Sequence, residues 1–105
     1  MDERTRRIGL NEAVFREVNE QLAGMAADRH LSLVCECGSA ACTERISMSR
    51  SDYERLRQDG ATFAVIPGHE IDDAEEVVGR HAEFWVVRKR SGGPAALAES
   101  LDPRG

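Results

Sequence analysis

Three cysteines, Cys35, Cys37 and Cys42, lie in one short segment of this 105-residue chain. The residues between the last two, Gly38-Ser39-Ala40-Ala41, are all small and cannot pack a hydrophobic core by themselves. An odd number of cysteines leaves one thiol unpaired in any disulfide framework. The spacing Cys35-x-Cys37-x4-Cys42 therefore predicts a metal site built on a turn.

The spacing is compatible with one tetrahedral zinc ion, in which two sulfur ligands lie about 3.8 Å apart. Residues two apart on a strand point to the same side, with Cα atoms about 6.6 Å apart. A bend at Gly38 lets the thiolates of Cys35 and Cys37 converge, and the small residues return the chain to Cys42. Gly38 also leaves room for backbone N–H groups to point at sulfur.

The fourth ligand has three histidine candidates. His69 follows Pro67-Gly68 at the end of an apolar strand, where a rigid turn can aim a side chain. We predict that His69 completes a structural zinc site. His30, His81, a carboxylate and water remain alternatives.

Two other interpretations of the cysteines compete with a metal site. Free cysteines are often small buried core residues, but a cluster on a segment without bulky apolar residues is a poor core. A reactive thiol needs a positive neighbour to lower its pKa. The charged residues near these cysteines are Glu36 and Glu44, with Arg45 next along the chain. We therefore favour the metal site.

The remaining pattern predicts an α+β fold with a long N-terminal helix packed on a small, mostly antiparallel sheet of about four strands, with a zinc knuckle. The long helix is expected over residues 11–28, from an N-cap at Asn11. Its apolar positions recur at helical spacing and predict a buried stripe: Val14, Phe15, Val18, Leu22, Met25 and Ala26.

Shorter elements are expected to follow the long helix. Residues 31–35 and 44–48 predict a hairpin with the cysteines at its tip. A second helix starts near Ser49, a capping residue, and ends at Gly60. Residues 62–66 and 84–87 predict two further strands, and a brief helix begins at Asp72 or Asp73.

Composition predicts the domain limits. The first residues are polar, so 1–8 is expected to be a flexible N-terminus. Residues 9–90 would form a single zinc-binding domain. Residues 91–105 begin Ser-Gly-Gly-Pro and lack an apolar stripe, so a disordered tail is expected there.

The charge balance disfavours two classes of partner. The net charge is −5, whereas sequence-independent nucleic-acid binding needs clustered positive charge. No apolar run is long enough for a membrane helix. The N-terminus lacks the apolar region of a secretory signal, so the cytoplasm is the expected compartment.

Four separated motifs resemble a family of small, uncharacterised actinobacterial proteins with a CxCG…C…PGH pattern. The resemblance spans about residues 4–89. It implies that the cysteines and the Pro-Gly-His element belong to one site, and it implies no activity. The motifs are residues 11–20, Cys35-Glu36-Cys37-Gly38, residues 42–46 and Pro67-Gly68-His69-Glu70.

The leading functional hypothesis is a non-catalytic zinc module that binds another protein, in regulation. The sequence lacks a phosphate-binding glycine loop, a nucleophile elbow and a His-Glu-x-x-His helix. One alternative is an enzyme with an open three-cysteine zinc, in which Glu36, Glu44 or Glu70 is the general base. The other is a zinc-dependent, nucleic-acid-binding transcription regulator. It requires seven arginines on one face: Arg4, Arg6, Arg7, Arg45, Arg50, Arg55 and Arg57.

Overall fold

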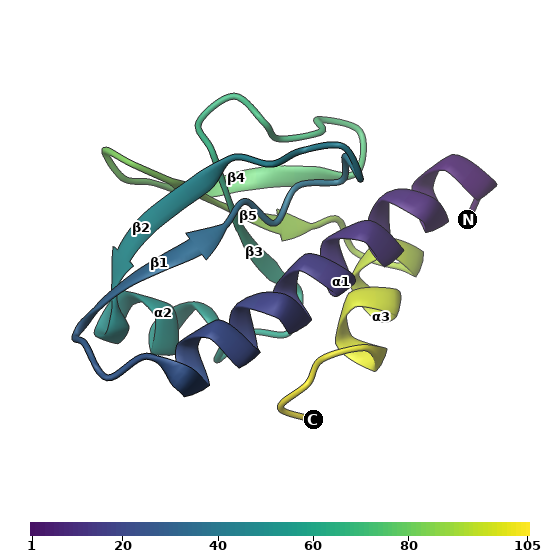
Figure 1. Cartoon of the computed structure of the whole chain (residues 1–105). Coiled ribbons are helices and arrows are strands. Elements are labelled where there is room, and N and C mark those ends of the chain that lie inside the picture. The colour runs from purple at the N-terminus through teal and green to yellow at the C-terminus, as the bar shows by residue number, and fades with distance from the viewer.

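The computed structural model describes residues 1–105, which form three helices and five strands. Figure 1 shows the long helix α1 crossing the molecule with α3 beside it and α2 near one end of the β1–β2 hairpin. None of the helices combines the length and the apolar composition needed to cross a membrane. The elements are α1 (Glu3–Met25), β1 (His30–Val34), β2 (Arg45–Ser49), α2 (Arg50–Leu56), β3 (Thr62–Val65), β4 (Glu75–Arg80), β5 (Trp85–Lys89) and α3 (Gly93–Ser100).

The strands form two antiparallel sheets. β1 pairs with β2, and the second sheet has the strand order β3-β5-β4. The α+β class and the predicted hairpin are confirmed, but the strands divide between two sheets instead of one sheet of about four. The sheets meet where the chain leaves β1, because the Glu36 N–H donates to the Ala64 carbonyl at 2.8 Å.

The hairpin buries one face by strict alternation. Leu31 lies opposite Met48 and Leu33 lies opposite Ile46, and all four are buried. This side-chain period of two is the one that strand geometry imposes. The core that these residues share also contains Ala23, Tyr53, Leu56, Ala64 and Phe84.

Helix α2 starts where the sequence predicted. Ser49 is its N-cap, and the Ser49 Oγ accepts a hydrogen bond from the Asp52 N–H at 3.1 Å. A serine at this position satisfies one of the free N–H groups of the first turn. Tyr53 and Leu56 are the buried residues of this short helix.

The predicted helix after Asp72 is wrong. Ile71 starts a single turn, since its carbonyl accepts from the Ala74 N–H at 2.9 Å, and the chain then continues as β4. The β-branched Val77 pairs with Val87 of β5, and the register shifts at Val78 in a β-bulge. The free edge of β5 provides the hydrogen-bond partners that favour a strand here.

Helix α1 begins at Glu3 and ends at Met25, not at the predicted Asn11 and Asp28. Asp2 is the N-cap, and its Oδ1 accepts from the Thr5 N–H at 2.7 Å. The predicted flexible N-terminus is therefore helical from Glu3. Aspartate is a common N-cap residue, so the sequence did contain a signal for this start. The polar residues that follow Asp2 led to the prediction of a flexible segment instead.

The predicted buried stripe of α1 is only partly right: Leu22 and Ala26 pack against the core and Phe15 is half-buried, but the other three residues are exposed. Val14, Val18 and Met25 are 60%, 40% and 76% exposed. The fully buried residues of α1 are others, and most of the large ones are polar: Ile8, Gly9, Glu12, Arg16, Asn19 and Ala23. These polar side chains can be buried because each of them forms hydrogen bonds or an ion pair inside the protein.

The clearest of these partners is Lys89. Its Nζ donates to Glu12 Oε1 at 2.7 Å and to Glu75 Oε1 at 3.1 Å, and all three side chains are nearly inaccessible to solvent. Buried charges are tolerated only when they are paired. Periodicity in a sequence cannot reveal such a pair, because Glu12 and Lys89 lie at opposite ends of the chain.

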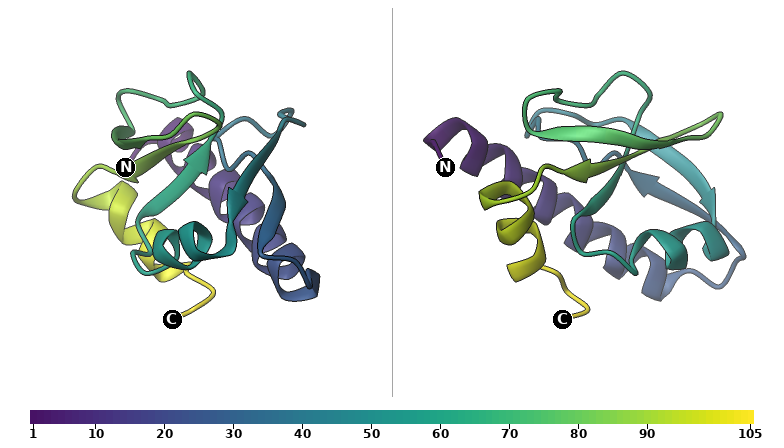
Figure 2. Two further views of the ribbon diagram at one scale, coloured as in Figure 1. Left: turned by 90° about the vertical axis from the view of Figure 1, so that its left-hand side faces the viewer. Right: turned by 180° about the vertical axis from the view of Figure 1, so that it is seen from behind.

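The predicted disordered tail is also wrong, since Gly93–Ser100 forms α3. Pro94 occupies the first turn, and Ala95 and Ala98 are buried. The guanidinium of Arg16 donates to the Ala98 carbonyl at 2.7 Å and lies over the Phe63 ring. Small side chains let α3 pack closely on α1, and these contacts replace the apolar stripe that the tail lacks (Figure 2).

Candidate metal centre

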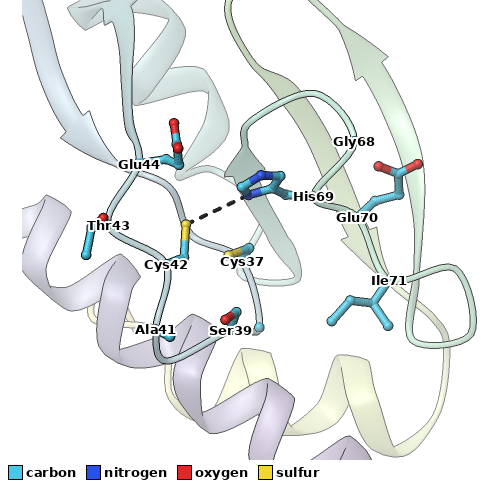
Figure 3. Close-up of a pocket in the computed structure, with 11 residues that line it drawn as sticks. Cys37, Ser39, Ala41, Cys42, Thr43, Glu44, Gly68, His69, Glu70 and Ile71 are labelled. Carbon is cyan, nitrogen blue, oxygen red and sulfur yellow. Dashed lines mark hydrogen bonds between the residues drawn. The ribbon is translucent and has the colours of Figure 1, made fainter.

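Four side chains converge beside the β1–β2 hairpin. One ligand atom from each of Cys35, Cys37, Cys42 and His69 lies within 4.8 Å of the other three. Cys35 directly follows β1, the other cysteines lie in the loop before β2, and His69 follows β3. Figure 3 shows His69 facing Cys42 and Cys37 across the site. The fold thus brings together all four predicted residues.

The distances fit a tetrahedral ion. His69 Nδ1 lies 3.6 Å from Cys35 Sγ and 3.8 Å from Cys42 Sγ. A tetrahedral zinc with Zn–S near 2.3 Å and Zn–N near 2.0–2.1 Å requires a sulfur–nitrogen separation of about 3.6 Å. The two sulfur–nitrogen distances therefore match those of such a tetrahedron, with Nδ1 as the histidine donor.

The turn that presents His69 is rigid. The His69 N–H donates to the Ile66 carbonyl at 2.9 Å, which closes a four-residue turn. Pro67 and Gly68 are its central residues, and Gly68 has φ +93°. These are the features of a type II turn, in which proline presets the first φ and glycine supplies the positive one. This Pro-Gly turn was the sequence feature from which His69 was predicted as the fourth ligand.

Gly38 is needed at the centre of the cysteine loop because helix α1 and the loop before β4 both approach it. A Cβ at this position would lie 2.5 Å from Ile8 Cγ2 and 2.9 Å from Ile71 Cδ1. The Asn11 side chain donates to the Gly38 carbonyl at 2.9 Å, which ties α1 to the loop. The sequence predicted Gly38 as a supporting residue, and the structure gives close packing as the reason.

Backbone groups and neighbouring thiols set the electrostatics of the sulfurs. The Ile66 N–H donates to Cys35 Sγ at 3.2 Å. A hydrogen bond from the Cys35 thiol lowers the pKa of Cys37 to about 5, and the same bond with burial raises the pKa of Cys35 far above its usual value. Burial also raises the pKa of Cys42. A divalent cation stabilises thiolates, so its binding would let all three sulfurs ionise.

Glu36 lies between the first two cysteines and anchors the cysteine loop to the rest of the protein. Its side chain is fully buried and forms a bidentate ion pair with Arg57, at 2.7 and 3.0 Å. It also accepts from Asn19 Nδ2 at 2.7 Å and from the Ala64 N–H at 3.0 Å. Because a buried carboxylate with four donors has little freedom, the two flanking cysteines are fixed in direction.

This support was missed by the sequence analysis. Glu36 was considered there as a general base, but both of its oxygens are occupied by hydrogen bonds inside the protein. Asn19, an amide in the middle of a long helix, was the one available signal, because such a residue is a poor helix former unless its side chain has a partner. Arg57 carried no signal in the sequence.

The other two histidines lie outside the cluster. The Nε2 atom of His30 forms a hydrogen bond with the Ser47 hydroxyl across the hairpin. The ring of His81 stacks on the Phe84 ring with centroids 4.3 Å apart. Both therefore have structural roles at other places in the fold.

A cavity of about 480 Å³ opens over the cluster and gives access to it from solvent. The half-buried Cys42 and His69 and the buried Cys37 line this cavity, whereas Cys35 is buried and does not line it. Figure 3 shows the carboxylates of Glu44 and Glu70 on either side of His69. A cation therefore has an entry path lined by negative charge.

A scan against protein-family models and searches of curated proteins and of solved structures found no match. These comparisons do not bear on the resemblance to small actinobacterial proteins, which stays a prediction. The function is therefore argued from the geometry of the site.

Proposed function

We propose that this chain binds one structural Zn²⁺ through Cys35, Cys37, Cys42 and His69, and that it is a non-catalytic regulatory module that binds another protein. The observation that carries the metal assignment is the position of His69 Nδ1, at tetrahedral distances from two of the sulfurs. Three thiolates and one imidazole are soft and borderline ligands, and in a tetrahedron they favour zinc over magnesium or calcium.

A closed site supports the non-catalytic assignment. Four protein ligands fill the tetrahedron and leave no position for a substrate or an activated water. Glu36, one of the candidate bases, is buried in an ion pair with Arg57. We place the protein in the cytoplasm, where thiols stay reduced and a three-cysteine site can persist.

The arginines support a protein partner over a nucleic acid. Arg57 is buried, Arg4 pairs with Asp73, and Arg55 pairs with Asp52. Further arginines of the seven donate to backbone carbonyls. They therefore do not form the free basic face that phosphate binding needs. The net charge of −5 favours a partner with a basic surface.

The metal assignment is tested on protein purified without a chelator. Native mass spectrometry should show one zinc per chain, and X-ray absorption should show three sulfur ligands and one nitrogen. His69→Ala should weaken zinc binding by at least about tenfold. His81→Ala is the matched control and should keep the wild-type affinity. Three sulfurs with a bound water in the wild type would contradict the closed site and favour the enzyme hypothesis.

The partner is tested by affinity capture from the native host with the zinc-loaded protein as bait, followed by mass spectrometry. A specific protein should be retained by the wild type and lost with the unfolded Cys37→Ser variant. Retention of nucleic acid that resists nuclease washing would favour the transcription-regulator alternative.

A further inference from the structure

The cavity over the cysteine cluster reaches two of its three cysteines. Cys37 and Cys42 both line it, and Cys42 is half-buried. Figure 3 shows the Cys42 sulfur facing His69 across the site. Cys35 is 1% exposed and does not line the cavity. A small solute that enters from solvent therefore meets Cys42 and Cys37 first.

The sulfurs of Cys37 and Cys42 are close enough for a disulfide to form with a small movement of the loop. All three cysteines are free, and their sulfurs lie within 4.8 Å of one another. A disulfide requires a sulfur–sulfur distance of about 2.05 Å, so the two sulfurs must approach each other by less than about 3 Å. The residues between these cysteines can accommodate this movement, because residues 39–41 are small and exposed. The Cys42 N–H donates to the Ser39 carbonyl at 3.1 Å, which already turns the chain back toward Cys37.

Cys35 is less free to move than Cys42. Its sulfur accepts a hydrogen bond from the Ile66 N–H at 3.2 Å, and its own N–H donates to the Glu44 carbonyl at 3.0 Å. A disulfide between Cys35 and Cys37 would close a ring around Glu36, whose buried side chain is fixed by hydrogen bonds. The geometry therefore favours Cys37 and Cys42 as the pair.

A bound metal supplies the positive charge that a reactive thiol needs. The sequence analysis disfavoured a reactive cysteine because the neighbouring charges are mostly acidic, and no lysine or arginine lines the cavity. A thiol that coordinates a divalent cation is deprotonated outright. The inference that follows therefore rests on the proposed function, in which these cysteines hold zinc as thiolates.

We propose that Cys37 and Cys42 form a redox switch, in which hydrogen peroxide joins them in a disulfide and the chain loses its metal site. The cysteines that act in such switches are accessible thiolates with a second cysteine beside them. Cys42 is the accessible thiolate here, and Cys37 is the cysteine beside it.

The reaction has two steps. The Cys42 thiolate attacks one oxygen of the peroxide, the oxygen–oxygen bond breaks, and the second oxygen takes up a proton and leaves as water. The Cys37 thiolate then attacks the sulfur of the resulting sulfenic acid, and the hydroxide that leaves takes up a second proton. Two thiolates, one peroxide and two protons thus give one disulfide and two waters. The sulfurs lose two electrons, and the peroxide gains them.

Formation of this disulfide should destabilise the module. Zinc binds thiolates, so only Cys35 and His69 of the four ligands would remain. The cysteine loop contacts β3 through Glu36 and α1 through Asn11, so loss of the metal would affect both sheets and the long helix. A thiol reductant reverses a disulfide by exchange, so reduction in the presence of Zn²⁺ should rebuild the site.

Titration of the zinc-loaded full chain with hydrogen peroxide tests the switch. A chromophoric chelator should detect one released zinc for each disulfide formed, and the intact mass should fall by two hydrogens. A single tryptic peptide, residues 30–45, contains all three cysteines. After alkylation of the remaining thiol, fragmentation of this peptide should place the label on Cys35. Dithiothreitol with Zn²⁺ should restore both the zinc content and the melting temperature.

Met25→Leu is the control for oxidation elsewhere. Met25 is 76% exposed and is also a target of peroxide, so this variant should release zinc at the wild-type rate. Retention of zinc in excess peroxide, a label on Cys37 or Cys42, or sulfinic acids in place of the disulfide would each overturn the switch. Zinc content is measured before peroxide is added. A chain without zinc contradicts the metal assignment and the switch together, whereas a zinc-loaded chain that resists peroxide contradicts the switch alone.

Discussion

At the scale of single residues, this protein buries several charged side chains, which are seldom fully buried unless they are paired. Glu12 and Glu75 share the ammonium of Lys89 inside the protein, and Glu12 Oε2 has no hydrogen-bond partner. Burial and the nearby Glu75 raise the pKa of Glu12 well above its ordinary value of 4.5. Two carboxylates around one cation leave an excess of negative charge, and retaining a proton on Glu12 relieves it.

This cluster predicts a pH dependence of stability. A raised folded-state pKa means that the folded chain binds the Glu12 proton more tightly than the unfolded chain. The contribution of Glu12 to the free energy of unfolding is therefore full below the ordinary pKa. It declines as the pH rises from there through the folded-state pKa. Glu12→Gln cannot titrate, so the wild type should lose stability relative to this variant over that range.

Urea unfolding at several pH values measures this difference. Glu17→Gln, on the exposed side of α1, is the matched control, and its stability should stay parallel to the wild type because its side chain faces water in both states. A wild type that gains stability relative to Glu12→Gln as the pH rises would contradict the protonated state of Glu12.

At the scale of elements, α3 shows how a short helix without an apolar stripe is held in place. Arg16 donates to the carbonyls of both Ala98 and Gly60, and the Gly9 position of α1 is so close to Leu97 that a Cβ would lie 2.9 Å from its Cδ2. The guanidinium of Arg16 and the close packing of α3 on α1 therefore hold α3 in place, without an apolar stripe. The composition of residues 91–105 does not reveal these contacts, so the sequence predicted a disordered tail.

Deletion of residues 91–105 tests the docking of α3. The deletion removes the Ala98 carbonyl from the buried guanidinium of Arg16 and exposes part of the core around Phe63. The melting temperature should fall by more than about 4 °C, which corresponds to roughly 1 kcal/mol in a domain of this size. A disordered tail, as expected from the sequence alone, would instead leave the melting temperature unchanged.

A shorter truncation provides the control for this deletion. Removing only Arg104 and Gly105 breaks exposed ion pairs with Glu20 and Glu54. Exposed pairs contribute little, about 0–1 kcal/mol. If both truncations lowered the melting temperature equally, the ion pairs and not the packing of α3 would hold this end of the chain.

At the scale of the whole molecule, the candidate metal centre lies where the parts of the fold join. Glu36 links the cysteine loop to β3, Asn11 links α1 to the same loop, and His69 follows β3. An ion at this point would tie both sheets and the long helix together. Because the unfolded chain has no preformed site, the free energy of metal binding would contribute to folding.

Removal of the metal should therefore destabilise the entire domain. A strong chelator should lower the melting temperature of the purified protein by well over about 4 °C, measured by differential scanning calorimetry. Added Zn²⁺ should restore it, whereas Mg²⁺ should not, because magnesium prefers oxygen ligands. A melting temperature that is indifferent to the chelator would show that the cluster stands without a metal.

The sequence by itself determined the features that depend on near neighbours in the chain. The cysteine spacing, the Pro67-Gly68 turn before His69, the Ser49 cap and the alternation of the hairpin all act over a few residues. Local geometry therefore makes these features readable without a structure.

Only the tertiary structure decided which face of α1 is buried, that β4 is a strand, that α3 docks, and that Glu36 supports the metal loop. Each of these depends on a partner far away in the sequence: Lys89 for Glu12, β5 for β4, Arg16 for Ala98, and Arg57 for Glu36. A buried polar residue is stable only with its partner in place. Local pattern assigns such a residue to the surface, and the fold that supplies the partner reverses that assignment.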